Sequence, residues 1–487
     1  MIAAYLLLLM PLVGVVFFAL FGHRPRIGRI NIKFNAFALL MSFWLALNVH
    51  KSGTLVSEGL YFLVDSFNVY LIVLTAFVGL TTSIFSAPYM RHEQQKGRLT
   101  EKRLRLYYSM YQGFMFAMYL VLTTNNMGIL WVAMEAATLA TVLLVSLYRT
   151  PESIEAAWKY FILCGVGIAQ AMFGTVLLYY AAMQISDAEN ALNWTVLIEN
   201  ASQLNPEIME ISFVFMLVGY GTKIGLVPLH NWLPDAHSEG PTPMSAVLSG
   251  LLLNDALYAV VRNKMIVDGA TQTNIAGYLM MGFGLLSFLV AAIFLHRQQD
   301  IKRLFSYSSV EHMGLMTFAF GMGTPFSTFA ALLHMTVHSL TKSAIFVTVG
   351  HAAQIAGTQQ IDKIRGLIKT QPSVGWGLLI GTLAIAGFPP FGVFTSEFLV
   401  LLATMQSYPW LTPFLLLGIG LACAGLFRNI QPMVYGKRPE GQQAVEANLW
   451  PVIIHLVLVL WLGLSIPQSL SDWFNQTTIL ISGSAPL

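Results

Sequence analysis

Ionisable side chains stand in the middle of several long apolar runs of this sequence. Glu135 lies in GILWVAMEAATLATVLLV, and Lys223 lies in LVGYGTKIGLVPLH. An ionisable residue at the centre of a membrane span costs at least ~2.5 kcal/mol, so it needs a partner, a cavity or a function. The residues placed in this way are Glu135, Lys223, Asp255, Glu311, His312, His334, His338, Lys342 and Glu397.

These residue types are suited to moving protons. A proton path needs groups that hold and release a proton, at spacings that water or a side-chain rotation can bridge. His334, His338 and Lys342 follow one another at i+4 steps, which places them on one face of a helix. A buried lysine can be switched between its charged and neutral forms when a carboxylate charge moves near it. The pattern therefore predicts a buried proton pathway shared by several helices.

The same residues also have structural interpretations. Glu135 and Lys223 could form a static ion pair that fixes helix packing. His334 and His338 could be hydrogen-bonded packing residues, and only the face that they share with Lys342 favours a functional role. Both interpretations stay open on the sequence alone.

Other charged and sulfur-containing residues have simpler explanations. We expect Asp65, at a span entrance, to be a cap or interface residue. Lys159 and Arg428 lie near span ends, where snorkelling is expected. Cys164 and Cys423 lie in apolar spans without CxxC spacing and are expected to pack as small apolar residues. The sequence contains no GxxxxGK, CxxCH or HExxH pattern, so we expect no cofactor, metal or catalytic centre in this chain.

Composition places all of these residues in a membrane protein. The chain has 487 residues, of which 56% are hydrophobic and 10% are charged, and its mean hydropathy is +0.66. An average soluble domain is about 25% charged, so this chain has too few charges to cover a soluble surface. Its apolar runs of about 20 residues are long enough to cross a bilayer. The sequence therefore predicts an all-α polytopic membrane protein.

The apolar runs give about fourteen candidate spans. The first, Ile2–Phe21, lacks the basic flank and the cleavage pattern of a signal peptide, so we expect it to remain as a helix. The next four lie near residues 35–48, after residue 65, before residue 123 and at residues 127–147. The remaining spans centre near Cys164, Tyr220, Leu252, Leu285, Glu311, Lys342, Leu383, Ile419 and Leu458.

Lysine and arginine in short loops predict the orientation, because cytoplasmic loops retain these residues. Loops after the first and third spans are basic, whereas residues 187–207 form an acidic loop. This predicts an even number of spans, both termini on the outer side, and location in a prokaryotic plasma (inner) membrane. Only Arg262 and Lys264 run against that orientation. The basic residues on the predicted inner side include Arg24, Arg26, Arg29, Lys33, Arg91, Lys96, Arg98, Lys102, Arg103, Arg105, Arg297, Lys302, Arg303, Lys363, Arg365 and Lys369.

Two spans are interrupted in a similar way. The seventh breaks at Gly225 to Pro228, just after Lys223, and the twelfth breaks at Gly387 to Gly392, just before Glu397. Lipid tolerates such breaks only where they face protein or a watery cavity. If the two breaks are equivalent, the repeat is five spans long, and an odd number of spans inverts the second copy. The predicted organisation is helices 1–3 at 1–105, a first repeat at 106–265, a second repeat at 266–436, and helix 14 with a tail at 437–487.

Several motifs resemble one family. VPLHNWLPDAHSEGPTPMSAVLSG, at Val227 to Gly250, is similar to the signature of the antiporter-like proton-translocating subunits of complex I, Mrp antiporters and membrane-bound [NiFe] hydrogenases. Matching segments surround the buried charges: WVAMEAATL, QDIKRLFSYSSVEHMGLM, HMTVHSLTKSAIF and AGFPPFGVFTSEFLVL. NNMGILWVAMEAATLATVLLVSLYRT, SGLLLNDALYAVVRNK and FGVFTSEFL most resemble the branch formed by the F components of hydrogenase-4-type membrane arms.

The resemblance implies a fold and residue roles. It implies fourteen helices in two inverted five-helix repeats, with broken helices 7 and 12. Glu135 would be the acid of the fifth helix, Lys223 its partner on the seventh, and Glu397 the ionisable group of the twelfth. His334, His338 and Lys342 would form the relay of the eleventh helix, and His230, within the signature, joins the expected pathway.

One position departs from the family pattern. Complex I subunits commonly have lysine or histidine where this sequence has Asn254, followed by Asp255. A neutral asparagine can orient water but carries no charge, so that step would pass to Asp255, to Glu311, to a bound water or to nothing.

The expected function is proton translocation within a redox-driven complex, such as a group 4 [NiFe] hydrogenase or a formate-hydrogenlyase-like assembly. The expected partners are other antiporter-like and small membrane subunits, a peripheral redox arm and lipids, with no nucleic acid. Because no lateral helix follows the last predicted span, we expect a position inside a row of subunits. The alternatives are an Mrp-type Na⁺/H⁺ antiporter subunit and a non-conducting structural subunit.

Overall fold

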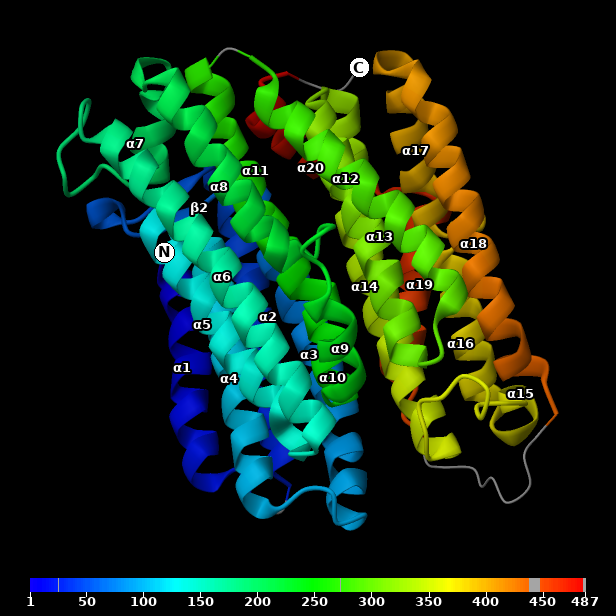
Figure 1. The fold of residues 1–487 in the computed structure, drawn as a ribbon. Helices are drawn as coiled ribbons and strands as arrows, with labels where there is room; N and C mark the ends of the chain where they lie inside the picture. The colour runs from blue at the N-terminus through cyan, green and yellow to red at the C-terminus, as the bar shows by residue number, and fades with distance from the viewer. Residues whose placement is uncertain (25, 272, 438–446, 485–487) are drawn as a thin grey trace.

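The protein is a bundle of long helices, shown in Figure 1 as a computed structural model. The structure describes residues 1–24, 26–271, 273–437 and 447–484. Strands β1 (Leu55–Val56) and β2 (Leu63–Val64) pair antiparallel, with Leu55 opposite Val64. The remaining elements are helical, which agrees with the all-α class predicted from composition.

Eight helical stretches in the described residues are long and apolar enough to cross a membrane, and the bent pair α19–α20 brings the number to nine. They are α1 (Ile2–Phe21), α2 (Ile27–Ser52), α3 (Ser66–Gln95), α5 (Met127–Val145) with its extension to Tyr148, α6 (Pro151–Ala182), Thr242–Thr271, α12 (Ile275–Phe294) with its extension to Arg297, and α18 (Thr412–Tyr435) with the turn that precedes it. Four further helices, more polar than these, have 19 residues or more: α4 (Glu101–Thr123), α8 (Pro206–Ile224), α13 (Ile301–Met322) and α14 (Pro325–Ala356).

Both predicted breaks are present. Helix α8 ends at Ile224, Gly225 follows at φ +83, and the chain becomes helical again in α9 (Trp232–Glu239). Helices α16 (Pro372–Ile385) and α17 (Gly392–Ser407) flank the second break, where Gly387 has φ +68. At the first break, the Val227 amide donates to the Ser287 hydroxyl at 2.9 Å. A side chain of the same chain thus satisfies a backbone N–H group that lipid could not.

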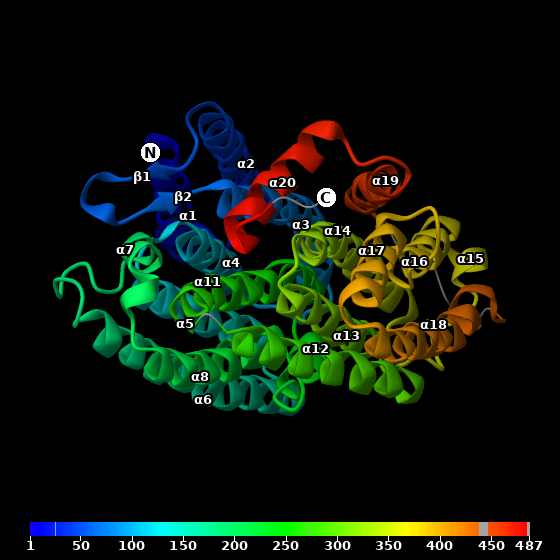
Figure 2. The ribbon, with the colours of Figure 1, turned by 90° about the horizontal axis from the view of Figure 1, so that it is seen from above.

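Helix α14 lies at the centre of the C-terminal half. It packs against α13, α16, α17, α19 and α20, and also against α3 from the N-terminal half. In Figure 2, α14 lies between α3 and α17. The stretch Thr242–Thr271, which comprises α10 (Thr242–Val247), a π-helical turn at Leu248–Leu252 and α11 (Leu253–Thr271), is buried throughout the apolar window that qualifies it as a span. The polar residues of α11, α13 and α14 are therefore enclosed by other helices.

The C-terminal segment contains more structure than the predicted tail. Helix α19 (Trp450–Leu464) is followed by α20 (Gln468–Ser482), and the two meet at a bend of 78°. The Trp473 indole N–H donates to the Ser66 carbonyl at 2.8 Å, which holds α20 against the start of α3. Residues 438–446 and 485–487, within the predicted 437–487 unit, lie outside the described residues.

Candidate functional site

Lys223 is held between α5, α6 and α8 without a carboxylate contact. Its side chain is fully buried, and its ammonium donates to the Thr138 hydroxyl. The Thr138 hydroxyl itself donates to the Met134 carbonyl at 3.1 Å. Lys223 Nζ lies 5.1 Å from the centre of the Tyr160 ring, whose negative face favours a cation. We call Glu135, Thr138, Tyr160 and Lys223 the first cluster.

Glu135 lies one helical turn before Thr138 and is only half-buried. Its Oε2 atom has no hydrogen-bond partner among the described residues. Glu135 and Lys223, both within the described part of the chain, form no ion pair at 4.0 Å or less. The static ion pair considered from the sequence is therefore not formed here, and a neutral hydroxyl contacts the lysine instead.

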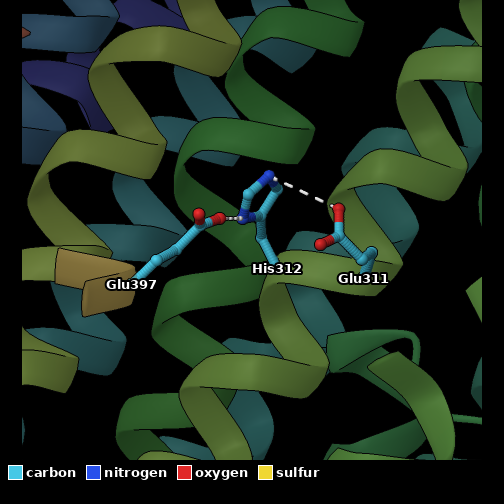
Figure 3. A group of neighbouring side chains, drawn as sticks. All are labelled: Glu311, His312 and Glu397. Carbon is cyan, nitrogen blue, oxygen red and sulfur yellow. Dashed lines mark ion pairs between the residues drawn. The ribbon is translucent and has the colours of Figure 1, made fainter. Parts of the chain in front are cut away.

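Glu311, His312 and Glu397 come together from α13 and α17. His312 Nε2 lies 3.5 Å from Glu311 Oε2, and His312 Nδ1 lies 3.8 Å from Glu397 Oε1. Figure 3 shows the imidazole between the two carboxylates. All three side chains are buried, and one ligand-type atom from each lies within 4.8 Å of the others, an arrangement that could hold a metal ion.

The histidines of α14 extend this group. His312 Nδ1 lies 3.1 Å from His334 Nε2, and His334 Nδ1 lies 2.8 Å from the Ser396 hydroxyl on α17. The His338 ring centre is 5.5 Å from that of His312, and neither His338 nitrogen has a hydrogen-bond partner among the described residues. Lys342 donates to the Phe305 carbonyl at 3.0 Å. The second cluster comprises Glu311, His312, His334, His338, Lys342, Ser396 and Glu397.

Asn254 and Asp255 lie on α11, beside α14. The Asn254 amide donates to the Ser339 hydroxyl at 2.7 Å and to the Met335 carbonyl at 3.3 Å. Asp255 is buried, and neither carboxylate oxygen has a hydrogen-bond partner among the described residues. Asn254 thus reaches the helix that carries the three α14 members of the second cluster, whereas Asp255 contacts no member of either cluster by a hydrogen bond or ion pair.

His230 lies apart from both clusters. It is buried at the first break, with its ring centre 6.0 Å from that of Tyr307 and 6.4 Å from that of Phe294. Its Nδ1 atom has no hydrogen-bond partner among the described residues. The structure therefore brings eight of the eleven predicted pathway residues into two clusters and leaves His230, Asn254 and Asp255 outside them.

Asp235 joins three helices at a charged site that the sequence analysis did not identify. Lys159 of α6 forms an ion pair with Asp235 at 2.5 Å, and Arg303 of α13 contacts the other Asp235 oxygen. The expectation that Lys159 only snorkels is therefore incomplete. Lys302, also missed, is buried and donates to the Gly240 carbonyl at 2.8 Å. Asp235, Lys302 and Arg303 all lie within the family-like motifs, but nothing in those motifs shows which residues contact one another.

Asp65 and Arg262 form a second unpredicted pair. Asp65 caps α3 by accepting from the Phe67 amide at 2.9 Å, as expected, and its other oxygen accepts from Arg262 at 2.6 Å. Both side chains are 2% exposed. The Arg262 guanidinium lies 4.3 Å from the Trp194 ring centre. Lys264 pairs with Asp268 one turn later, so both basic residues that ran against the predicted orientation carry an acidic partner.

Comparisons with known proteins agree on one family. A family model described as "NADH:quinone oxidoreductase/Mrp antiporter, TM" matches residues 124–422, which include both clusters. The "Hydrogenase-4 component F homolog" of Methylacidiphilum infernorum is 45% identical over 98% of this chain and 100% of its own length.

Solved structures share the fold over nearly the whole chain. A subunit of an archaeal membrane-bound sulfane sulfur reductase superposes with a TM-score of 0.88 at 22% identity, covering 98% of this chain and 97% of that one. A chain of the Mrp complex from Dietzia sp. DQ12-45-1b superposes with a TM-score of 0.86 at 16% identity, covering 99% and 98%. At these identities the likeness is one of fold.

Proposed function

This chain is a multi-pass, antiporter-like membrane subunit of the NADH:quinone oxidoreductase/Mrp antiporter family, and from that premise we propose that it carries protons within a redox-driven complex. The observation that supports this proposal best is the second cluster. It places two carboxylic acids, three imidazoles and one lysine inside a bundle whose other core residues are mostly apolar. So many buried titratable groups are costly unless they are used.

Contacts within the second cluster suit stepwise proton transfer. An imidazole can accept a proton on one nitrogen and release another from its second nitrogen. His312 and His334 are in hydrogen-bond contact, and His334 also contacts Ser396, so a proton can pass between α13, α14 and α17. Glu311 and Glu397, on opposite sides of His312, would receive or supply that proton. Lys342, on the same face of α14, would set the charge of this group.

The finer architecture belongs to the same proposal. We infer fourteen spans, because α4, α8, α13 and α14 are long enough to cross although they are more polar, and because α16–α17 continues across its break. The two breaks, five spans apart, support inverted repeats with the predicted boundaries. Acidic partners for Arg262 and Lys264 remove the exception to the loop-charge pattern, which supports both termini lying on the outer side.

The complex that we propose is of the membrane-bound hydrogenase type, with its electron-transfer cofactors in other subunits. A relative at 45% identity carries the name hydrogenase-4 component F homolog, which supports this choice. The partners would be antiporter-like and small membrane subunits, a peripheral [NiFe] or related redox arm, and lipids. In this arrangement, electron transfer in the arm would shift charges that act on Glu135 and Lys223, and the second cluster would then exchange protons.

An Mrp-type Na⁺/H⁺ antiporter subunit is the second candidate. The family description and the fold likeness to the Dietzia Mrp complex favour it. A non-conducting structural subunit is the third, because Asn254 puts a neutral side chain on α11, where complex I subunits carry charge. Whether proton uptake depends on Na⁺ or on electron transfer distinguishes these candidates.

The test is redox-driven proton uptake by the intact complex in liposomes. Lys223→Ala and Glu135→Gln are compared separately with wild type, after assembly has been checked for each. Lys51→Ala, which removes an exposed lysine, is the matched control. We expect uptake to collapse in Lys223→Ala and to persist in the control. Proton uptake at the wild-type level in both Lys223→Ala and Glu135→Gln would favour the structural subunit. Na⁺-dependent uptake without electron transfer would favour the antiporter.

A further inference from the structure

We propose that Glu311, His312 and Glu397 form a binding site for a divalent transition-metal ion of the zinc class, and that the bound ion blocks the proton path. The binding follows from the geometry of the site alone. The block rests on the proposed function, because it requires protons to pass through these same three groups.

The spacing of the three groups fits a metal better than it fits hydrogen bonds. The two imidazole–carboxylate separations, 3.5 Å and 3.8 Å, are both too long for a hydrogen bond. His312 Nε2 is buried and has no hydrogen-bond partner among the described residues. Ligands about 2.0–2.2 Å from a tetrahedral zinc ion lie roughly 3.4 Å apart. The ligand-type atoms here lie within 4.8 Å of one another, so a bound ion would draw both carboxylates inward. Glu397, which lies 3.8 Å from Nδ1, would have to turn toward the Nε2 side of the ring. Glu311 already lies beside Nε2, at 3.5 Å.

Charge and donor type select the ion. Among the described residues, neither Glu311 nor Glu397 forms an ion pair with a lysine or arginine. A divalent ion would neutralise both carboxylates in a site where an isolated charge is costly. Na⁺, Mg²⁺ and Ca²⁺ favour oxygen ligands, whereas one imidazole nitrogen with two carboxylates is a set that zinc-class ions accept.

The surroundings supply what the three ligands lack. His334 contacts His312 Nδ1 at 3.1 Å and would orient the imidazole if its Nε2 bound the ion. A cavity of about 10 Å³, close to the smallest volume that holds one water molecule, lies beside the two carboxylates and is lined by Glu311, Glu397 and Cys423. With the ion bound, both carboxylates and the imidazole would be unable to exchange protons.

The test measures metal binding and proton uptake separately on the intact, metal-depleted complex. Zn²⁺ bound after equilibrium dialysis is compared among wild type, Glu311→Gln and Asp255→Asn, the last being a buried acid outside the group. We expect wild type and Asp255→Asn to bind one more Zn²⁺ than Glu311→Gln at low Zn²⁺. The affinity lost should be about 10- to 100-fold or more, the range for losing even an outer partner of a metal ligand. Zinc X-ray absorption of wild type should show nitrogen and oxygen ligands with an imidazole.

The opposing outcomes are distinct. Equal binding by wild type and Glu311→Gln, or displacement of Zn²⁺ by equimolar Na⁺ or Mg²⁺, would overturn the site. If Glu311→Gln does not assemble, Glu397→Gln and the wild-type absorption spectrum decide the same question. If Zn²⁺ binds as expected but uptake in liposomes is unchanged, the site stands and the proton path through it does not.

Discussion

The two clusters hold their charges in opposite ways. In the first, one buried lysine contacts a neutral threonine, and the acid on the preceding turn is half-exposed. In the second, two acids, three imidazoles and a lysine are all buried, and His312 lies close to both acids and to His334. The first arrangement leaves the lysine free to respond to charges nearby, whereas the second offers several adjacent sites for a proton. Under the proposed function, the first cluster would respond to charge and the second would transfer protons.

The position of each cluster in the bundle explains this difference. Only half of the apolar window of α5 and 39% of that of α6 are buried inside the chain, so Glu135 lies near the outer surface of the bundle. Under the proposed function, the charge of a partner subunit would act on it there. Helices α13 and α14 are covered on nearly every side, and an ion there meets only protein. The first cluster thus lies near the surface of the bundle, whereas the second is enclosed by the chain itself.

The largest effect is expected from removing the lysine of the second cluster. Lys342 is the one lysine of the second cluster, and its ammonium reaches the Phe305 carbonyl on α13, the helix that carries Glu311, so Lys342→Ala leaves the buried acids of the cluster without a cation. A charge within a membrane span costs at least about 2.5 kcal/mol. If this cost is added to the barrier, proton transfer slows roughly 100-fold. The initial rate of redox-driven proton uptake in liposomes measures this loss. A Lys342→Ala variant that assembles and pumps at more than a third of the wild-type rate would remove the distinction between the clusters.

A smaller effect is expected when the neutral partner of Lys223 is removed. Thr138→Val keeps the shape of the side chain but deletes the hydroxyl that the ammonium contacts. A hydrogen bond to a charged group contributes about 1.5–3 kcal/mol, and the lower end of that range already corresponds to about tenfold in rate. Thr138→Ser, which restores the hydroxyl, is the matched control and should recover most of the uptake. If valine and serine behave alike, Thr138 does not position the lysine.

The sequence predicted the charged members of the clusters better than their partners. The i+4 spacing of His334, His338 and Lys342 on a helix, and the adjacency of Glu311 and His312, are local features that a sequence shows directly. Thr138 and Ser396 are ordinary neutral hydroxyls, and nothing local marks them as contacts. Their roles depend on which helices pack together.

Ion pairs between residues far apart in the sequence could not be predicted from local patterns either. Asp65 and Arg262 are 197 positions apart, and only the exception that Arg262 made to the loop charges hinted at a buried partner. Helices α8 and α13 are too polar to meet a hydropathy criterion for a span, although the apolar runs in the sequence predicted spans centred near Tyr220 and Glu311. The amphipathic α20 gave no run of about 20 apolar residues, so the sequence predicted a tail where a helix lies across α3 and α14.

The smallest effect is expected at Asn254, which tests whether the two clusters are one path. Asn254→Ala removes hydrogen bonds to Ser339 and Met335, at a cost of about 1 kcal/mol each in stability. Because the amide carries no charge, uptake should fall by less than about threefold, and Asn254→Asp should restore little. Uptake rates and unfolding temperatures of both variants measure this. A loss as large as that of Lys342→Ala would mean that the amide orients an essential proton carrier, and sensing and transfer would then be steps of one continuous route through α11.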